Sequence, residues 1–147
     1  MKFPLLISLL LLTTPLLAPV TGFVMIGEGE RVARYDPIVT SFMFVESGFR
    51  KDTVNSLNAG GILQIRPEMI QEANRILKLK GRALKYILDD RLDSAKSVNI
   101  WYTVQNYWNP RYELKRAARI WNPKADERYY QRIRKYMQQL KNPQYEK

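Results

Sequence analysis

The chain has 147 residues, with 24 Lys and Arg against 14 Asp and Glu, and it contains neither His nor Cys. Without these two residue types there can be no Ser-His-Asp triad, no thiol nucleophile, no disulfide bridge and no zinc site of the usual His/Cys kind. Any catalysis must therefore use Asp, Glu, Tyr, Ser or Lys, and the sequence predicts neither a metal site nor a cofactor. The length is that of one domain with a modest core.

The N-terminus has the three parts of an export signal. Lys2 supplies the charge, residues 5–12 are apolar apart from one serine, and residues 13–22 carry small residues and prolines. These features predict a signal peptide spanning 1–22. A cut after Ala18 is disfavoured by the proline that would follow it. The alternative, an uncleaved membrane anchor, is disfavoured because the apolar run is short and broken by prolines.

The charge that remains after export is strongly positive. Removing the signal peptide would take away one lysine and no acid, which leaves 125 residues with a net charge of +9. The cell wall and the membrane surface are the anionic partners of an exported protein. Nucleic acid is the usual rival for such a charge, but the basic residues are spread along the predicted helices, where many would simply be solvated. We expect a periplasmic or secreted monomer that binds no nucleic acid and is not stably inserted in a membrane.

The rest of the chain predicts a mainly α domain with a minimal strand element. Residues 23–34 are expected to be a loose lead-in, 35–140 the domain, and 141–147 a polar tail. Apolar residues at helical spacing, bounded by capping residues and prolines, predict the helices. The expected helices lie at about 36–48, 67–81, 93–109, 112–121 and 126–140, with a further short helix at 84–88 and a strand or extended segment at 62–65.

Glu46 is the leading candidate for chemistry. It lies seven residues after Val39 and four after Phe42, which places it on the apolar face at the C-terminal end of its helix. Burial and the negative end of the helix dipole both favour its neutral form. A protonated carboxyl can act as the general acid that glycosidic bond cleavage requires. The alternative is an ordinary surface residue near a helix end. Gln64, in a glycine-rich apolar segment, could orient this acid or bind a substrate amide.

Four segments form an ordered set of motifs. Val-Glu-Ser-Gly-Phe at 45–49 ends a helix, and Gly-Ile-Leu-Gln-Ile-Arg-Pro at 61–67 opens another. Ile-Trp-Asn follows at 120–122, and Asp-Glu-Arg-Tyr-Tyr at 126–130. This set resembles the soluble lytic transglycosylase family, whose motifs are Glu-Ser-Gly-Phe, Gly-Leu-Met-Gln-Ile-x-Pro, Ala-Tyr-Asn and Glu-Thr-Arg-x-Tyr. The resemblance covers roughly residues 36–137.

The resemblance implies a compact, lysozyme-like helical domain that cleaves the β-1,4 bond between N-acetylmuramic acid and N-acetylglucosamine in peptidoglycan. Glu46 would protonate the leaving oxygen and then accept the proton of the muramoyl 6-hydroxyl, so that an anhydro end forms without water. A loop serine assists the acid in the family. Counting without a gap puts Asn55 in that role, whereas residue type favours Ser56. The substrate-binding residues that the resemblance implies are Ser56, Gln64, Trp121, Asn122 and Tyr130.

Two departures from the family pattern keep other interpretations open. Pro123-Lys124 follows Asn122 where the family has Ala-Gly, so this cleft wall is remodelled. Trp121 replaces a tyrosine, and it fits a core position as well as a sugar-stacking one. Asn122 could simply be the amide at a helix end. Core packing is the better expectation for the remaining tryptophans, Trp101 and Trp108.

The reaction type depends on a second carboxylate. An inverting hydrolase needs one roughly 6.5–9.5 Å from the acid, and a retaining hydrolase needs one at about 5–5.5 Å. Asp52 is the candidate nearest in sequence to Glu46, but nothing singles it out. The alternatives are therefore a muramidase, a non-catalytic peptidoglycan-binding or assembly module on the same fold, and a cationic membrane-active protein.

Overall fold

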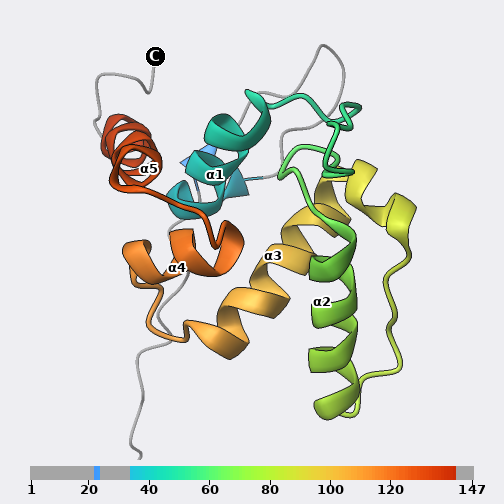
Figure 1. The fold of residues 1–147 in the computed structure, drawn as a ribbon. Helices are drawn as coiled ribbons and strands as arrows, with labels where there is room; N and C mark the ends of the chain where they lie inside the picture. The colour runs from blue at the N-terminus through green and yellow to red at the C-terminus, as the bar shows by residue number, and fades with distance from the viewer. Residues whose placement is uncertain (1–21, 24–33, 142–147) are drawn as a thin grey trace, which may run out of the picture.

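The computed structural model describes residues 22–23 and 34–141, and these form a mainly helical domain (Figure 1). The predicted signal peptide, apart from Gly22, and the tail beyond Lys141 lie outside the described residues. The elements, in chain order, are β1 (Gly22–Phe23), β2 (Arg34–Tyr35), α1 (Pro37–Ser47), α2 (Pro67–Leu79), the 3-10 helix η1 (Leu88–Leu92), α3 (Ser94–Trp108), α4 (Leu114–Trp121) and α5 (Glu127–Leu140).

The small strand element differs from the expected one. The two ends of the expected lead-in, Phe23 and Arg34, pair with each other in the antiparallel sheet of β1 and β2. The segment expected to be a strand or an extended segment, 62–65, is a turn that ends in an isolated bridge: Gly60 pairs with Val54 on one side and with Ile65 on the other. The chain after α1 is therefore a tightly folded loop and not a sheet.

The helix ends follow the capping signals in the sequence. The Asp36 carboxylate accepts a hydrogen bond of 2.8 Å from the backbone N–H of Ile38 at the start of α1, and Gly48 ends the helix with a left-handed φ of +60°. Asp93 and Asp126 cap α3 and α5 in the same way as Asp36. An aspartate at this position satisfies a backbone donor that the helix itself leaves free.

Two expected helices begin later than the periodicity suggested. α4 begins at Leu114 and not at 112, because Tyr112 has a left-handed φ of +53° that no α-helix contains. The short helix expected at 84–88 is wrong. A 3-10 helix forms instead at Leu88–Leu92, where the Asp90 carboxylate accepts a hydrogen bond of 2.8 Å from the backbone N–H of Ile87.

One hydrophobic core holds these helices together. Trp101 of α3 is fully buried at its centre, with its ring centroid 5.4 Å from that of Phe42 in α1 and 6.4 Å from that of Trp121 in α4. α1 packs against α5 and α2 against α3, as Figure 1 shows. Aromatic rings of this size dominate the burial energy of a small core. In the described residues, no helix is long and apolar enough to cross a membrane.

Two adjacent glycines allow the loop after α1 to pack closely against η1. A Cβ atom on Gly61 would lie 1.7 Å from the backbone oxygen of Arg91, and Gly61 has a φ of +75°. A side chain on Gly60 would meet the Arg91 guanidinium, which is buried and donates hydrogen bonds of 2.5 and 2.9 Å to the backbone and side-chain oxygens of Asn58. The glycine pair is thus required by packing.

Candidate active site

Glu46 lies in the last turn of α1 and remains partly exposed. Its neighbour Ser47 is buried, and the Ser47 hydroxyl bonds the backbone oxygens of Ile62 at 2.8 Å and Met43 at 3.2 Å. This contact joins the end of α1 to the glycine-rich segment, so the first two sequence motifs are packed directly against each other. This junction holds the last turn of α1, which carries Glu46, against that segment.

Tyr129 of α5 is the residue that meets this carboxylate. Its hydroxyl donates a short hydrogen bond to Oε1 of Glu46. The first turn of α5 places Tyr129 there, because the Asp126 cap accepts a hydrogen bond of 2.8 Å from its backbone N–H. Burial and the neighbouring Glu46 charge raise the pKa of Tyr129 well above its usual range. The phenol therefore stays protonated and acts as a donor at any working pH.

The electrostatic surroundings of Glu46 favour an acid. Burial raises the pKa of Glu46 above its ordinary value of 4.5, and it outweighs the Tyr129 hydrogen bond and the positive charges of Arg132 and Arg66, which lower that pKa. Arg132 is held in place by a bond of 3.3 Å to the backbone oxygen of Val45. No Asp or Glu of the described residues is among the groups that shift the pKa of Glu46. The site thus has one carboxyl, one phenol and two guanidinium groups.

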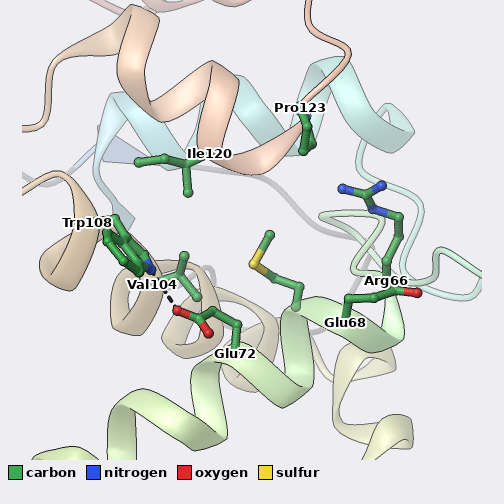
Figure 2. A pocket seen from close by; sticks show the side chains of 8 residues that line it. Arg66, Glu68, Glu72, Val104, Trp108, Ile120 and Pro123 are labelled. Carbon is green, nitrogen blue, oxygen red and sulfur yellow. Dashed lines mark hydrogen bonds between the residues drawn. The ribbon is translucent and has the colours of Figure 1, made fainter.

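Arg66 connects Glu46 to an open pocket. Its guanidinium lies 3.5 Å from the backbone oxygen of Trp121, and it lines a pocket of about 440 Å³ between α2, α3 and α4. Figure 2 shows Arg66 at one end of this pocket and Trp108 at the other. The complete lining consists of Arg66, Glu68, Met69, Glu72, Val104, Trp108, Ile120 and Pro123.

Glu72 gives the pocket a fixed negative charge. It accepts a hydrogen bond of 2.7 Å from the indole N–H of Trp108 and two more, also of 2.7 Å, from Arg75. The direct Arg75 hydrogen bond holds the pKa of Glu72 below its usual range. Glu72 therefore stays ionised and holds the exposed ring of Trp108 against the pocket wall.

The loop residues of the site are hydrogen-bonded among themselves. Gln64 has a left-handed φ of +48°, and its amide nitrogen donates to Thr53 and to the backbone oxygen of Gly61 at 3.0–3.3 Å. The two candidates for the assisting residue, Asn55 and Ser56, are both exposed to solvent. The Asn55 side chain donates a hydrogen bond of 3.1 Å to the Gln64 side-chain oxygen. The structure places Gln64 and Asn55 together as braces of the loop.

The two residues at the end of α4 serve mainly local packing. Trp121 is buried, and its indole N–H donates a hydrogen bond of 3.0 Å to the backbone oxygen of Leu63. Of its two interpretations, the core position is the one observed. Asn122 is half-buried, and its side-chain oxygen accepts a hydrogen bond of 3.1 Å from the backbone N–H of Lys124. Its amide thus forms the turn before α5.

The tyrosine assignment changes by one residue. Tyr130, implied by the resemblance, is half-buried with the Lys115 ammonium 5.0 Å from its ring centroid, while Tyr129 bonds Glu46. Sequence periodicity missed Tyr129 because Tyr130, Ile133 and Met137 make an apolar stripe on α5. A parallel stripe through Tyr129, Ile133 and Tyr136 has the same helical spacing, and it is the one that faces α1.

Two further observations concern carboxylates away from Glu46. Asp52, the nearest candidate for a second carboxylate in sequence, is exposed and is not among the groups that perturb Glu46. No group of three or more acidic side chains that could hold a metal ion occurs in the part of the chain that the structure describes.

Comparison with protein-family models, with curated proteins and with solved structures returned no match to this chain.

Proposed function

We propose that this protein is an exported peptidoglycan lytic transglycosylase with Glu46 as its single acid and base. The observation that carries the proposal is the partly exposed Glu46 carboxyl, whose pKa burial raises and whose Oε1 accepts a hydrogen bond from Tyr129. The four ordered motifs support it, because they suggest peptidoglycan as the substrate. A carboxyl with a raised pKa is the group that such a reaction needs as its acid.

The reaction needs no group beyond those at the site. Protonated Glu46 gives its proton to the glycosidic oxygen as the bond from that oxygen to the muramoyl C1 breaks. The resulting carboxylate accepts the proton of the muramoyl 6-hydroxyl while that oxygen bonds to C1, which closes the anhydro ring and restores the acid. Tyr129 bonds Oε1 in both states and leaves Oε2 for the proton. Arg66 and Arg132 stabilise the intermediate carboxylate.

The charged groups around Glu46 support this reaction over hydrolysis. A muramidase would need a second carboxylate to activate water or to form a covalent intermediate. Among the described residues, the charged groups that act on Glu46 are both arginines. A group that must act as acid and then as base benefits from cations nearby, since they lower the cost of its charged state.

The pocket beside Arg66 is the place where we expect the glycan strand to continue. Met69, Ile120 and Pro123 give it an apolar wall for sugar faces and acetyl methyl groups. The exposed ring of Trp108 offers a stacking surface at the far end of the pocket, held there by Glu72. An apolar pocket with a few fixed polar groups is the usual form of a binding site.

A non-catalytic peptidoglycan-binding or assembly module is the second candidate. The observation that favours it is that the amides of Gln64 and Asn122 are already used within their own loops. Such a module would use the same pocket but would release nothing from the wall.

Digestion of purified peptidoglycan sacculi tests the proposal. The full chain should release soluble muropeptides, and Glu46→Gln, which keeps an acceptor for Tyr129, should not. Binding to sacculi without any release would favour the non-catalytic module. Equal release by the wild type and by Glu46→Gln would show that Glu46 is not the acid.

A further inference from the structure

The C-terminal end of α2 carries a surface of exposed basic and aliphatic side chains. α2 runs away from Arg66 to a turn and an extended segment that leads to η1 (Figure 1). With 13 residues at 1.5 Å each, α2 is about 20 Å long, so this end lies about 20 Å along the helix from Arg66. We call it the basic-aliphatic surface, and its residues are Lys78, Leu79, Lys80, Arg82, Leu84 and Lys85.

The cations of this surface converge on one pocket. Lys78, Arg82 and Lys85 line a pocket of about 410 Å³, together with Arg75, and its lining residues include no Asp or Glu. Among the described acids near it, Glu72 is bridged to Arg75, and Asp90 to Lys96 at 2.5 Å. The pocket therefore presents a net positive charge suited to an anionic group.

Nonpolar side chains stand beside these cations. Leu79 is 62% exposed and Leu84 58%, although side chains of this kind usually lie in a core. They flank a segment that is held firmly, because the side chain of Asn74 bonds both the backbone N–H of Tyr86 at 2.7 Å and its carbonyl oxygen at 2.8 Å. The exposed aliphatic residues are thus presented by an anchored backbone.

We propose that the basic-aliphatic surface docks the protein on a membrane of anionic phospholipids. Lysine and arginine near such a surface each add to the binding by attraction to the lipid phosphates. Leucine side chains beside them can enter the boundary between headgroups and acyl chains. Phosphate headgroups would occupy the cationic pocket, and Leu79 and Leu84 would lie at the lipid boundary.

The chemistry of the surface favours lipid over other polyanions. Proteins that bind single-stranded nucleic acid offer exposed aromatic rings on which the bases stack. In residues 78–87 the exposed nonpolar side chains are aliphatic, and the one aromatic residue, Tyr86, is buried. The nearest exposed rings, Tyr107 and Trp108, are already in contact with the Arg75 guanidinium, 5.5 and 5.9 Å from their centroids. Docking through this end would leave Arg66, which acts on Glu46, at the other end of α2.

Vesicle flotation with the purified full chain tests the proposal. We expect binding to phosphatidylcholine vesicles that contain phosphatidylglycerol, and little binding to phosphatidylcholine alone. Replacing Lys78, Arg82 and Lys85 together by Gln should weaken binding about a hundredfold. The matched control replaces Arg111, Arg116 and Lys135 by Gln, which removes the same charge from exposed sites elsewhere, and it should weaken binding by less than about threefold.

The aliphatic contribution needs its own variant. Leu79→Ser with Leu84→Ser should weaken vesicle binding at least about tenfold and preserve its salt dependence. Equal losses in the two charge variants, no loss in the serine variant, or tighter binding to single-stranded nucleic acid than to vesicles at the same salt would each overturn the proposal. The altered side chains are exposed, and unchanged thermal melting confirms the fold. The assay contains no peptidoglycan, so its result is independent of Glu46 chemistry.

Discussion

Glu46 and Glu72 have similar hydrogen-bond partners, but their pKa values are shifted in opposite directions. Each accepts a hydrogen bond from an aromatic side chain, Tyr129 for Glu46 and Trp108 for Glu72. Each also lies within the influence of arginines. Yet the pKa of Glu46 is raised and that of Glu72 is lowered.

The difference lies in how the arginine acts and in how far water is removed. Arg75 bonds both oxygens of Glu72 at 2.7 Å, so the charged form is directly stabilised. The arginines near Glu46 act only through their charge, and burial outweighs them. A directly hydrogen-bonded arginine thus keeps a carboxylate ionised. A buried carboxyl with arginines that act only through their charge can instead both donate and accept a proton.

The largest effect is expected for catalysis itself. Glu46→Gln should lower the rate of muropeptide release by about 10²–10⁴-fold, the usual contribution of a general acid. Glu72→Gln should lower it by less than about tenfold, because Glu72 supports only the pocket wall. Both rates can be measured on soluble glycan strands. Similar losses in the two variants would show that burial does not distinguish these carboxyls.

Tyr129→Phe should have a smaller effect with a characteristic pH dependence. The Tyr129 hydrogen bond lowers the pKa of Glu46, so its loss should raise that pKa further. Since the protonated acid is the active form, the falling limb of the pH–rate profile should move to higher pH, with a loss of rate of about tenfold from poorer positioning.

The matched control is Tyr130→Phe, which should leave that limb in place. A limb that moves in Tyr130→Phe, or stays fixed in Tyr129→Phe, would contradict the assignment of Tyr129 as the partner of Glu46.

The pH dependence of protein stability should also reveal the raised pKa of the partly buried Glu46 carboxyl. The pKa of Glu46 in the folded state lies above its unfolded value of 4.5. At pH values between these two pKa values, the folded state therefore binds more protons than the unfolded state. The favourable contribution of Glu46 is complete below the unfolded pKa and is lost as the pH rises through the folded pKa. As the pH rises through this range, the wild type should therefore lose stability relative to Glu46→Gln. Thermal melting of both proteins across the pH range would show this change. A constant difference across the pH range would argue against burial as the cause.

The smallest effect concerns Glu72 alone. Arg75→Gln should raise the pKa of Glu72 toward its usual value, because the direct hydrogen bonds that lower it are removed. An NMR titration of the side-chain carboxyl carbons would follow Glu72 and Glu46 in the same sample. The pKa of Glu46 should not move, and a parallel shift of both groups would mean that the two sites are electrostatically coupled.

The helices were predictable because their signals are local. Asp36-Pro37, Pro67, Asp93 and Asp126 mark helix starts by their own chemistry, and the structure places a helix after each. The late start of α4 depends on the left-handed backbone of Tyr112, which no propensity of a tyrosine predicts. The role of the glycine pair could not be foreseen, since it depends on the approach of Arg91 from thirty residues away.

The site was predictable only in part. The position of Glu46 on the apolar side of α1 indicated its burial correctly. The choice between Tyr129 and Tyr130 depends on how α5 is rotated against α1, and both tyrosines fit a helical stripe. The buried indole of Trp121 and the braced amide of Gln64 follow from contacts across the fold, which a single sequence does not reveal.

The most direct test of a single acid and base is digestion of peptidoglycan in water enriched in heavy oxygen. The account predicts anhydro-muramoyl products that carry no heavy oxygen and that depend on Glu46, because the 6-hydroxyl of the sugar and not water attacks C1. Mass spectrometry would resolve the two outcomes. Reducing ends that carry heavy oxygen would contradict the account and would require a second group to activate water.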